Sequence, residues 1–176
     1  MKKIIGTIIT LVIGGTVFTF SQADVVKNFS KDTGLTQQEA QQYVDGIKKE
    51  DLQSFDKTGT DLASQGQHIV EKANEIDCVN YTYKWESDSL NCEEGKFQLN
   101  TIGNDEITLG NEYKVLDAQK ATKDDMSLVI RDIDTSNSDL DLGITSAILD
   151  PSTIESLKKT NNYNKALLQS ALDSKR

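Results

Sequence analysis

The stretch of sequence that decides how this chain folds runs from Cys78 to Cys92, Cys-Val-Asn-Tyr-Thr-Tyr-Lys-Trp-Glu-Ser-Asp-Ser-Leu-Asn-Cys. It contains both cysteines and the only tryptophan of the chain, and it separates two long regions in which apolar residues recur at helical spacing. Apolar and polar residues alternate along its first half, which predicts a short strand with one apolar face. The apolar positions are Val79, Tyr81, Tyr83 and Trp85.

The two cysteines are expected to form a disulfide. A bridge requires Cα atoms within about 7 Å of each other, whereas an extended chain from Cys78 to Trp85 would span about 23 Å. The chain must therefore turn back. A hairpin centred on Asp88 would place Cys78 opposite Gln98 rather than Cys92, so we expect the bridge to join the end of one helix to the start of the next. Closing a loop of about 15 residues would stabilise the fold by about 3 kcal/mol.

The N-terminal segment is typical of a bacterial secretory signal. Met1-Lys2-Lys3 precedes an uncharged, largely apolar run over residues 4–20, and small residues come just before a predicted cut after Ala23. The alternative is an uncleaved membrane anchor, because the run is at the short limit for spanning a bilayer. We therefore predict a signal peptide over residues 1–23 and a single helical domain over residues 24–176, exported to the periplasm or outside the cell.

Composition narrows the possible partners. The chain has 28 acidic and 19 basic residues, a net charge of −9 that becomes −11 when Lys2 and Lys3 leave with the leader. Such an acidic surface disfavours nucleic acid and anionic lipid, which bind clustered lysine and arginine. Two cysteines in an exported chain are expected to pair rather than to hold a metal. We predict no cofactor, and membrane association only if the leader is uncleaved.

Most of the remaining chain is predicted to be helical. Several helix starts carry capping signals. These are Thr36 with Glu39, Thr122 with Asp125, and Asp150 followed by Pro151. Helical spacing over residues 52–76 is consistent with one irregular helix or with two helices broken near Gly59. Residues 94–116 match a helical pattern at more positions than an alternating one.

The predicted fold is thus mainly α, an irregular multi-helix domain with one or two short β-strands around the disulfide-closed segment. Residues 31–40, Lys-Asp-Thr-Gly-Leu-Thr-Gln-Gln-Glu-Ala, resemble the first helical hairpin of bacterial histone-like DNA-binding proteins. The sequence lacks the basic arm of that family, so the resemblance indicates helix packing and no shared function.

Residues for common catalytic chemistries are few. His68 is the only histidine, which leaves no histidine-based metal cluster and at most one Ser-His-Asp arrangement. It lies beside Ile69 and Val70 without a nucleophile motif, so we expect a surface histidine. Pairs of neighbouring carboxylates are numerous, as expected by chance among so many acidic residues. We identify no catalytic residue.

Two groups of residues are candidates for ligand binding. An exposed face of Tyr81, Tyr83 and Trp85 would form a platform for sugar rings or a protein partner, whereas a buried face would belong to the core. The second group is an acidic run that contains Asp132, Asp134, Asp139 and Asp141.

These four aspartates are a weak Ca²⁺ candidate. Counted from Asp132, positions six and twelve are Asn137 and Gly143, where an EF-hand requires glycine and glutamate. A solvated acidic loop is the alternative interpretation.

Three functional hypotheses follow. The first is a small exported helical protein that binds a protein or surface partner and catalyses no reaction. The second is a carbohydrate-binding module that uses the aromatic face of Tyr81, Tyr83 and Trp85. The third is a carboxylate-based hydrolase, which requires two acidic groups about 5 to 9.5 Å apart across a cleft.

Overall fold

The computed structural model describes residues 7–47, 55–78, 92–117, 121–141 and 149–174. This part of the chain contains one two-stranded sheet and six helices. They are β1 (Ile8–Ile13), β2 (Thr16–Ser21), α1 (Gln22–Thr33), α2 (Gln37–Gly46), α3 (Phe55–Glu75), α4 (Cys92–Leu116), α5 (Lys123–Leu140) and α7 (Pro151–Asp173). The prediction of a mainly α fold is confirmed. Across the described ranges, no helix combines the length and apolar character needed to cross a bilayer.

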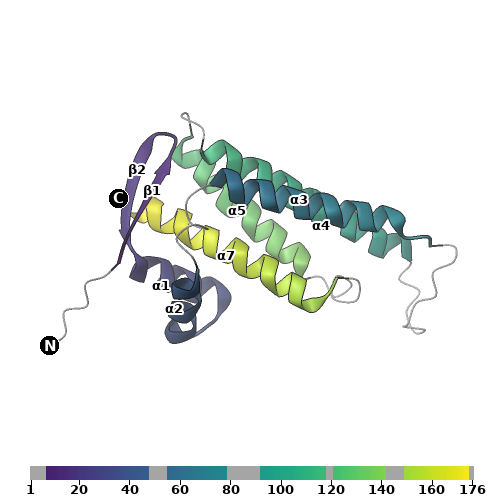
Figure 1. Ribbon diagram of the computed structural model, residues 1–176, viewed down its shortest axis with the longest axis horizontal. Coiled ribbons are helices and arrows are strands. Elements are labelled where there is room, and N and C mark those ends of the chain that lie inside the picture. The colour runs from purple at the N-terminus through teal and green to yellow at the C-terminus, as the bar shows by residue number, and fades with distance from the viewer. Residues whose placement is uncertain (1–6, 48–54, 79–91, 118–120, 142–148, 175–176) are drawn as a thin grey trace.

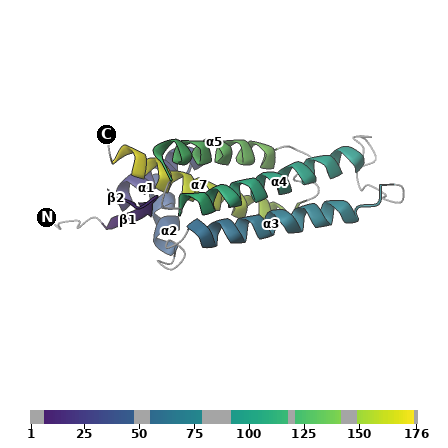
Figure 2. The ribbon, with the colours of Figure 1, turned by 90° about the horizontal axis from the view of Figure 1, so that it is seen from above.

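Helix α7 lies in the middle of the molecule (Figure 1). It packs against α1 on one side and α5 on the other, and β2 also contacts it. Helix α4 packs between α3 and α5, and α2 packs on α1. The antiparallel pair α3–α4 is the longest part of the molecule, and one of its ends extends beyond α5 and α7 (Figures 1 and 2).

Side chains close to each helix start explain where three of the helices begin. Capping boxes form where a hydroxyl accepts a hydrogen bond from the backbone N–H of the third helical residue, whose carboxylate accepts one from the N-cap N–H. They are Ser21 with Asp24, Thr36 with Glu39, and Thr122 with Asp125. The starts predicted at Thr36, Thr122 and Asp150 are confirmed.

Glycines let α3 and α4 approach closely. Gly59 faces Gly110, and Gly66 faces Gly103. A Cβ atom built on Gly66 would lie only 2.4 Å from the carbonyl oxygen of Gly103. Helix α3 runs without a break through both of its glycines, so the single-helix alternative is confirmed for residues 55–75. The glycines serve contact with α4 rather than a break in the helix.

The two strands form a hairpin within the predicted leader. Ile13 pairs with Thr16 next to a two-residue turn, and Gly14 and Gly15 have positive φ angles of 56° and 74°, as favoured in tight hairpins. Four side chains on its inner face are buried against the helices, namely Leu11, Ile13, Phe18 and Phe20. The strand predicted within residues 79–91 lies outside the described residues.

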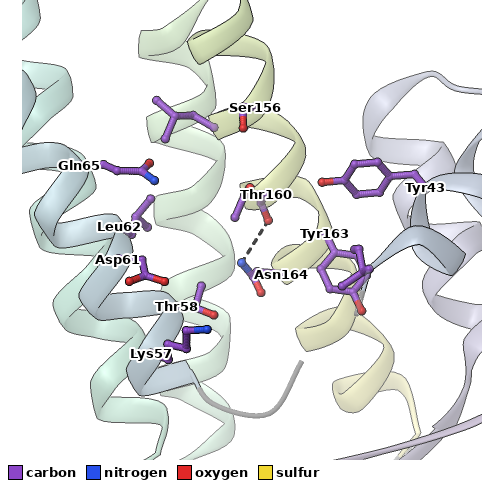
Figure 3. Close-up of a pocket in the computed structure, with 12 residues that line it drawn as sticks. Tyr43, Lys57, Thr58, Asp61, Leu62, Gln65, Ser156, Thr160, Tyr163 and Asn164 are labelled. Carbon is purple, nitrogen blue, oxygen red and sulfur yellow. Dashed lines mark hydrogen bonds between the residues drawn. The ribbon is translucent and has the colours of Figure 1, made fainter. Parts of the chain in front are cut away.

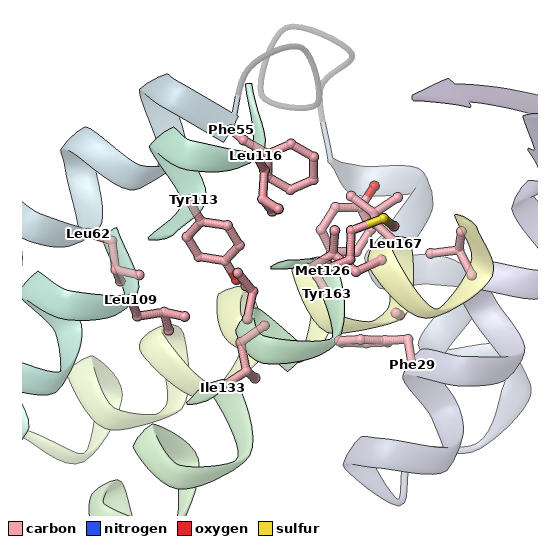
Figure 4. Packing of buried hydrophobic residues seen from close by; sticks show 14 of the residues in the cluster. Phe29, Phe55, Leu62, Leu109, Tyr113, Leu116, Met126, Ile133, Tyr163 and Leu167 are labelled. Atoms are coloured by element: carbon pink, nitrogen blue, oxygen red, sulfur yellow. The ribbon is translucent and has the colours of Figure 1, made fainter. Parts of the chain in front are cut away.

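Buried aromatic rings join the parts of the core (Figure 4). Phe55 of α3 stacks on Tyr113 of α4 with ring centroids 5.7 Å apart. Tyr163 of α7 makes edge contacts with both Phe29 of α1 and Tyr43 of α2. Residues of α2, α3 and α7 also line a polar groove.

Candidate binding sites

A disulfide closes one end of the α3–α4 pair. Cys78 follows α3, Cys92 is the first residue of α4, and their Cα atoms are 5.3 Å apart. The bridge therefore joins a helix end to a helix start, as the sequence predicts. We call residues 71–78 and 92–100 the distal end, because this end of the pair extends beyond α5 and α7 (Figure 2). Tyr81, Tyr83 and Trp85 lie outside the described residues, in the segment that the bridge closes.

The distal end carries an exposed aromatic side chain that sequence reasoning missed. Phe97 on α4 is 70% exposed, the largest value among the described large hydrophobic residues. The spacing of apolar residues along α4 indicates that Phe97 is exposed. Leu99 and Ile102 lie on the buried face of α4, and Phe97, about 200° around the helix from Leu99, lies off that face. The exposed carboxylates Glu93 and Glu94 are close to Phe97 in the sequence.

A groove of about 330 Å³ lies between α3 and α7, and Tyr43 of α2 closes one side of it (Figure 3). Most of its lining is polar but uncharged. Hydroxyl and amide groups come from Thr58 and Gln65 of α3 and from Ser156, Thr160 and Asn164 of α7. Asp61 and Lys57 supply one charge of each sign. The volume is at the lower end of the range for small-molecule sites.

Two tyrosines form the aromatic part of this groove. Tyr43 stacks on Phe29 with ring centroids 4.8 Å apart. Tyr163 is only 6% exposed, and its hydroxyl has no hydrogen-bond partner among the described residues. Burial raises the pKa of both phenols, which therefore stay neutral. The groove thus offers neutral hydrogen-bonding groups beside aromatic rings.

The acidic run that suggested a Ca²⁺ site belongs mostly to a helix. Helix α5 continues through it to Leu140, so the interpretation of residues 132–143 as an acidic loop is wrong for residues 132–140. The reason is tertiary packing. Ile133, Ser136 and Leu140 recur at helical spacing and are buried, which outweighs the local polar composition.

The four aspartates of the Ca²⁺ candidate point to different partners. Asp132 pairs with Arg131 at 2.9 Å, Asp134 pairs with Lys165 at 2.7 Å, and Asp141 pairs with Lys158. Asp139 faces Asp105 of α4. Nowhere in the described ranges do three or more possible metal ligands cluster, so the structure does not assemble this site.

The interface between α4 and α5 contains buried acids that the sequence analysis did not single out. Glu106 is fully buried and accepts a hydrogen bond of 2.6 Å from the Ser136 hydroxyl. Burial raises its pKa, and hydrogen bonds from Ser136 and Asn161 partly offset this. The sequence does indicate a buried acid here, because Glu106 interrupts the apolar stripe between Ile102 and Leu109.

Two carboxyl pairs flank Glu106. Asp105 lies beside Asp139, and Glu112 lies beside Asp132. Burial, reinforced by these acidic neighbours, raises the pKa of Asp105 and of Glu112 to about 7. None of these four carboxyls lines the groove of Figure 3, so these pairs do not form the facing acids that a hydrolase would require across that groove.

Two further residues bear on catalysis. His68 is exposed on α3, at a position that fits a surface histidine. Among the described residues that line the groove of Figure 3, Asp61 is the one that carries a carboxylate. The hydrolase hypothesis gains no support from either residue and stays a prediction.

Comparison of the chain with protein-family models, with curated proteins and with solved structures gives no significant match. The function is therefore argued from the geometry of the chain itself.

Proposed function

We propose that this protein acts by binding a protein or surface partner, without catalysing a reaction, and that the distal end of α3–α4 is the surface it uses. The exposure of Phe97 carries the proposal. Aromatic side chains are enriched at the centres of protein interfaces, where they contribute large apolar area. A side chain of this size that is 70% exposed has most of its surface left for a partner to bury.

The structure of the distal end suits recognition. The disulfide ties the two helices together at this end, and the glycine contacts hold them along their length. Phe97 is thereby presented on a firm support, which lowers the entropic cost of binding. The surrounding exposed residues include Glu71, Glu93 and Glu94. We therefore expect a partner with an apolar pocket and a basic rim.

The disulfide also bears on where the partner is found. Such bridges persist in oxidising compartments and are rare in the cytosol, so the bridge points to a non-cytoplasmic setting. Export through a leader cut after Ala23, to the periplasm or the cell exterior, is part of this proposal.

Site-specific photo-crosslinking tests the proposal. A photoreactive phenylalanine analogue is placed at position 97, and at position 115 as a control, in cells that naturally make the protein. Val115 lies on the same helix, near its other end, and is 50% exposed. We expect a discrete protein adduct from position 97 and none from position 115. Equal adducts from both positions, or none from position 97, would overturn the proposal.

The partner from the adduct is then purified and its affinity measured. We expect Phe97→Ser to weaken binding by at least about tenfold, the effect of losing roughly 1.4 kcal/mol at a central contact. The matched variant Val115→Ser should bind like the wild type. Unchanged binding by Phe97→Ser would place the interface elsewhere.

A second candidate function is carbohydrate binding, which the lining of the groove favours. Its hydroxyl, amide and phenol groups suit a neutral polyhydroxylated ligand of about monosaccharide size. Titration of ¹⁵N-labelled protein with glucose and N-acetylglucosamine tests it, with Thr160→Val expected to weaken saturable shifts and Ser152→Ala, outside the groove, to leave them unchanged. Quenching of Trp85 fluorescence by cell-wall glycans would instead support the platform of Tyr81, Tyr83 and Trp85.

A further inference from the structure

We propose that the interface between α4 and α5 is a proton-dependent clasp, in which α5 packs firmly on α4 while each carboxyl pair shares a proton and loosens when the pairs ionise. This inference goes beyond partner binding. It rests on a ladder of acids within the body of the molecule, away from the distal end.

The ladder follows from the register of two antiparallel helices. Asp105 and Glu112 are seven residues apart on α4, and their partners Asp139 and Asp132 are seven residues apart on α5. Residues seven apart lie on the same face of a helix, two turns from each other. The buried contact between Glu106 and Ser136 lies between the two pairs. Three acids of α4 therefore face α5 together.

These acids are poorly compensated. Each of the three has one carboxyl oxygen that is cut off from solvent and lacks a hydrogen-bond partner among the described residues, namely Asp105 Oδ2, Glu106 Oε2 and Glu112 Oε2. An ionised carboxylate is only an acceptor, so a hydrogen bond between two carboxyls exists only while one carries a proton. Without that proton two negative charges meet at a partly dry interface, and they repel.

Among the described residues, Arg131 is the one cation that acts on Glu112, and none acts on Asp105. On α5, the cation near the ladder is Arg131, which pairs with Asp132 and lowers the pKa of Glu112. The neighbours that act on Asp105 are the acids Asp139, Glu106 and Asp132, and all of them raise its pKa.

The contacts that α3 and α7 make close to the ladder include uncharged residues. From α3, Ala63, Gly66 and Val70 approach α4. From α7, the amide of Asn161 donates to Ser136 at 3.3 Å. Lys165 of α7 is engaged elsewhere, with Asp134 and Asp32.

The sign of the pH effect follows from the raised pKa values. Unfolded Asp and Glu release their protons near pH 4, whereas Asp105 and Glu112 hold theirs in the fold to about pH 7. Between these limits the folded state binds more protons than the unfolded state, so stability falls as pH rises through this window. Below about pH 4 both states are protonated, and above about pH 7 the loss is complete.

Hydrogen exchange locates the effect. We expect protection factors of α5 amides in the wild-type protein to fall by at least about tenfold from pH 5 to pH 8, relative to those of α1, because one unit of pKa shift corresponds to a factor of ten. The urea midpoint should likewise be higher at pH 5. Equal protection of α5 at both pH values would overturn the clasp.

Variants separate the clasp from the general charge of the protein. In Asp105→Asn with Glu112→Gln, amide groups replace both acids and donate permanently. We expect this double variant to lose the pH dependence and to exceed the wild type in stability at pH 8. The control, Glu71→Gln with Glu94→Gln, removes the same charge from exposed positions and should keep the dependence.

Equal flattening of the pH dependence by both double variants would mean a general charge effect and would refute the proposal. If the Asp105 and Glu112 variant does not fold, Asp139→Asn tests the Asp105–Asp139 pair from α5. It should shrink the pH dependence, and an unchanged dependence would count against the clasp.

Discussion

Replacement of Gly66 by alanine tests how closely α3 and α4 must approach. The new Cβ atom would lie 2.4 Å from the carbonyl oxygen of Gly103 and 2.8 Å from the amide nitrogen of Ile107. Both atoms belong to the backbone of α4, so no side-chain rotation relieves the contact. Reaching 3.0 Å, below which real Cβ contacts essentially never fall, requires the helices to separate by roughly 0.6 Å.

Two opposing effects determine how much Gly66→Ala changes the free energy of unfolding. Overpacking of a well-filled contact costs about 1–3 kcal/mol, and a gap of this size also weakens the dispersion contacts along the helix pair by about a quarter. Alanine stabilises a helix by about 1 kcal/mol relative to glycine, because its helix propensity is higher. Because the clash is between backbones, we place the cost at the upper end and expect a net loss of about 2 kcal/mol in the free energy of unfolding.

Urea unfolding followed by circular dichroism at 222 nm measures this loss, and Gly46→Ala is the matched control. A Cβ atom on Gly46 would meet no atom within 4 Å, so this variant should be neutral or stabilised by up to about 1 kcal/mol. The double variant Gly59→Ala with Gly66→Ala should cost less than the sum of the single changes, since one separation of the helices accommodates both methyl groups. A Gly66→Ala protein as stable as the wild type would refute the close-approach argument.

Three further predictions follow from the same structure. Reduction of the disulfide should lower the free energy of unfolding by about 3 kcal/mol, measured as the urea midpoint with and without reductant, and an unchanged midpoint would show that the bridge adds no stability. Ser136→Ala should cost about 1–3 kcal/mol because it removes a hydrogen-bond donor from the buried Glu106 carboxyl, whereas the exposed Ser138→Ala should be nearly neutral, and equal losses would contradict this role. Intact mass after alkylation, with and without reduction, should show a chain that begins at Asp24 and is alkylated only after reduction. A full-length chain with free thiols in the membrane fraction would refute cleavage after Ala23.

The helix starts that depend on neighbouring residues were predicted well from the sequence. The capping boxes at Thr36 and Thr122 and the Asp150-Pro151 start each depend on residues within one helical turn. Their hydrogen bonds form whatever packs around them, so the sequence contains all the information they need. The equivalent box of Ser21 and Asp24 was missed because those residues were assigned to the cleavage region of a leader.

Features that need two distant segments were not predictable in the same way. The role of Gly66 depends on Gly103 lying opposite, and the carboxyl pairs depend on the register between α4 and α5. The helical end of α5 was missed for a related reason. Its local composition favours a loop, and only burial of Ser136 and Leu140 against other helices holds it in a helix.

Residues 8–20 meet the requirements of two different structures, and this explains why a segment that predicts part of a leader folds as a hairpin. A leader needs an uncharged, largely apolar run, whereas the hairpin depends on the Gly14-Gly15 turn and on side chains that alternate between buried and exposed. In the fold, Phe18 and Phe20 are buried and Ser21 caps α1. A peptidase that cuts after Ala23 must therefore act before this region folds, and the cut removes both the cap and the apolar cover that β2 places on α1 and α7. Export would then create a second apolar surface, on the opposite side of the molecule from the distal end of α3–α4 (Figure 1).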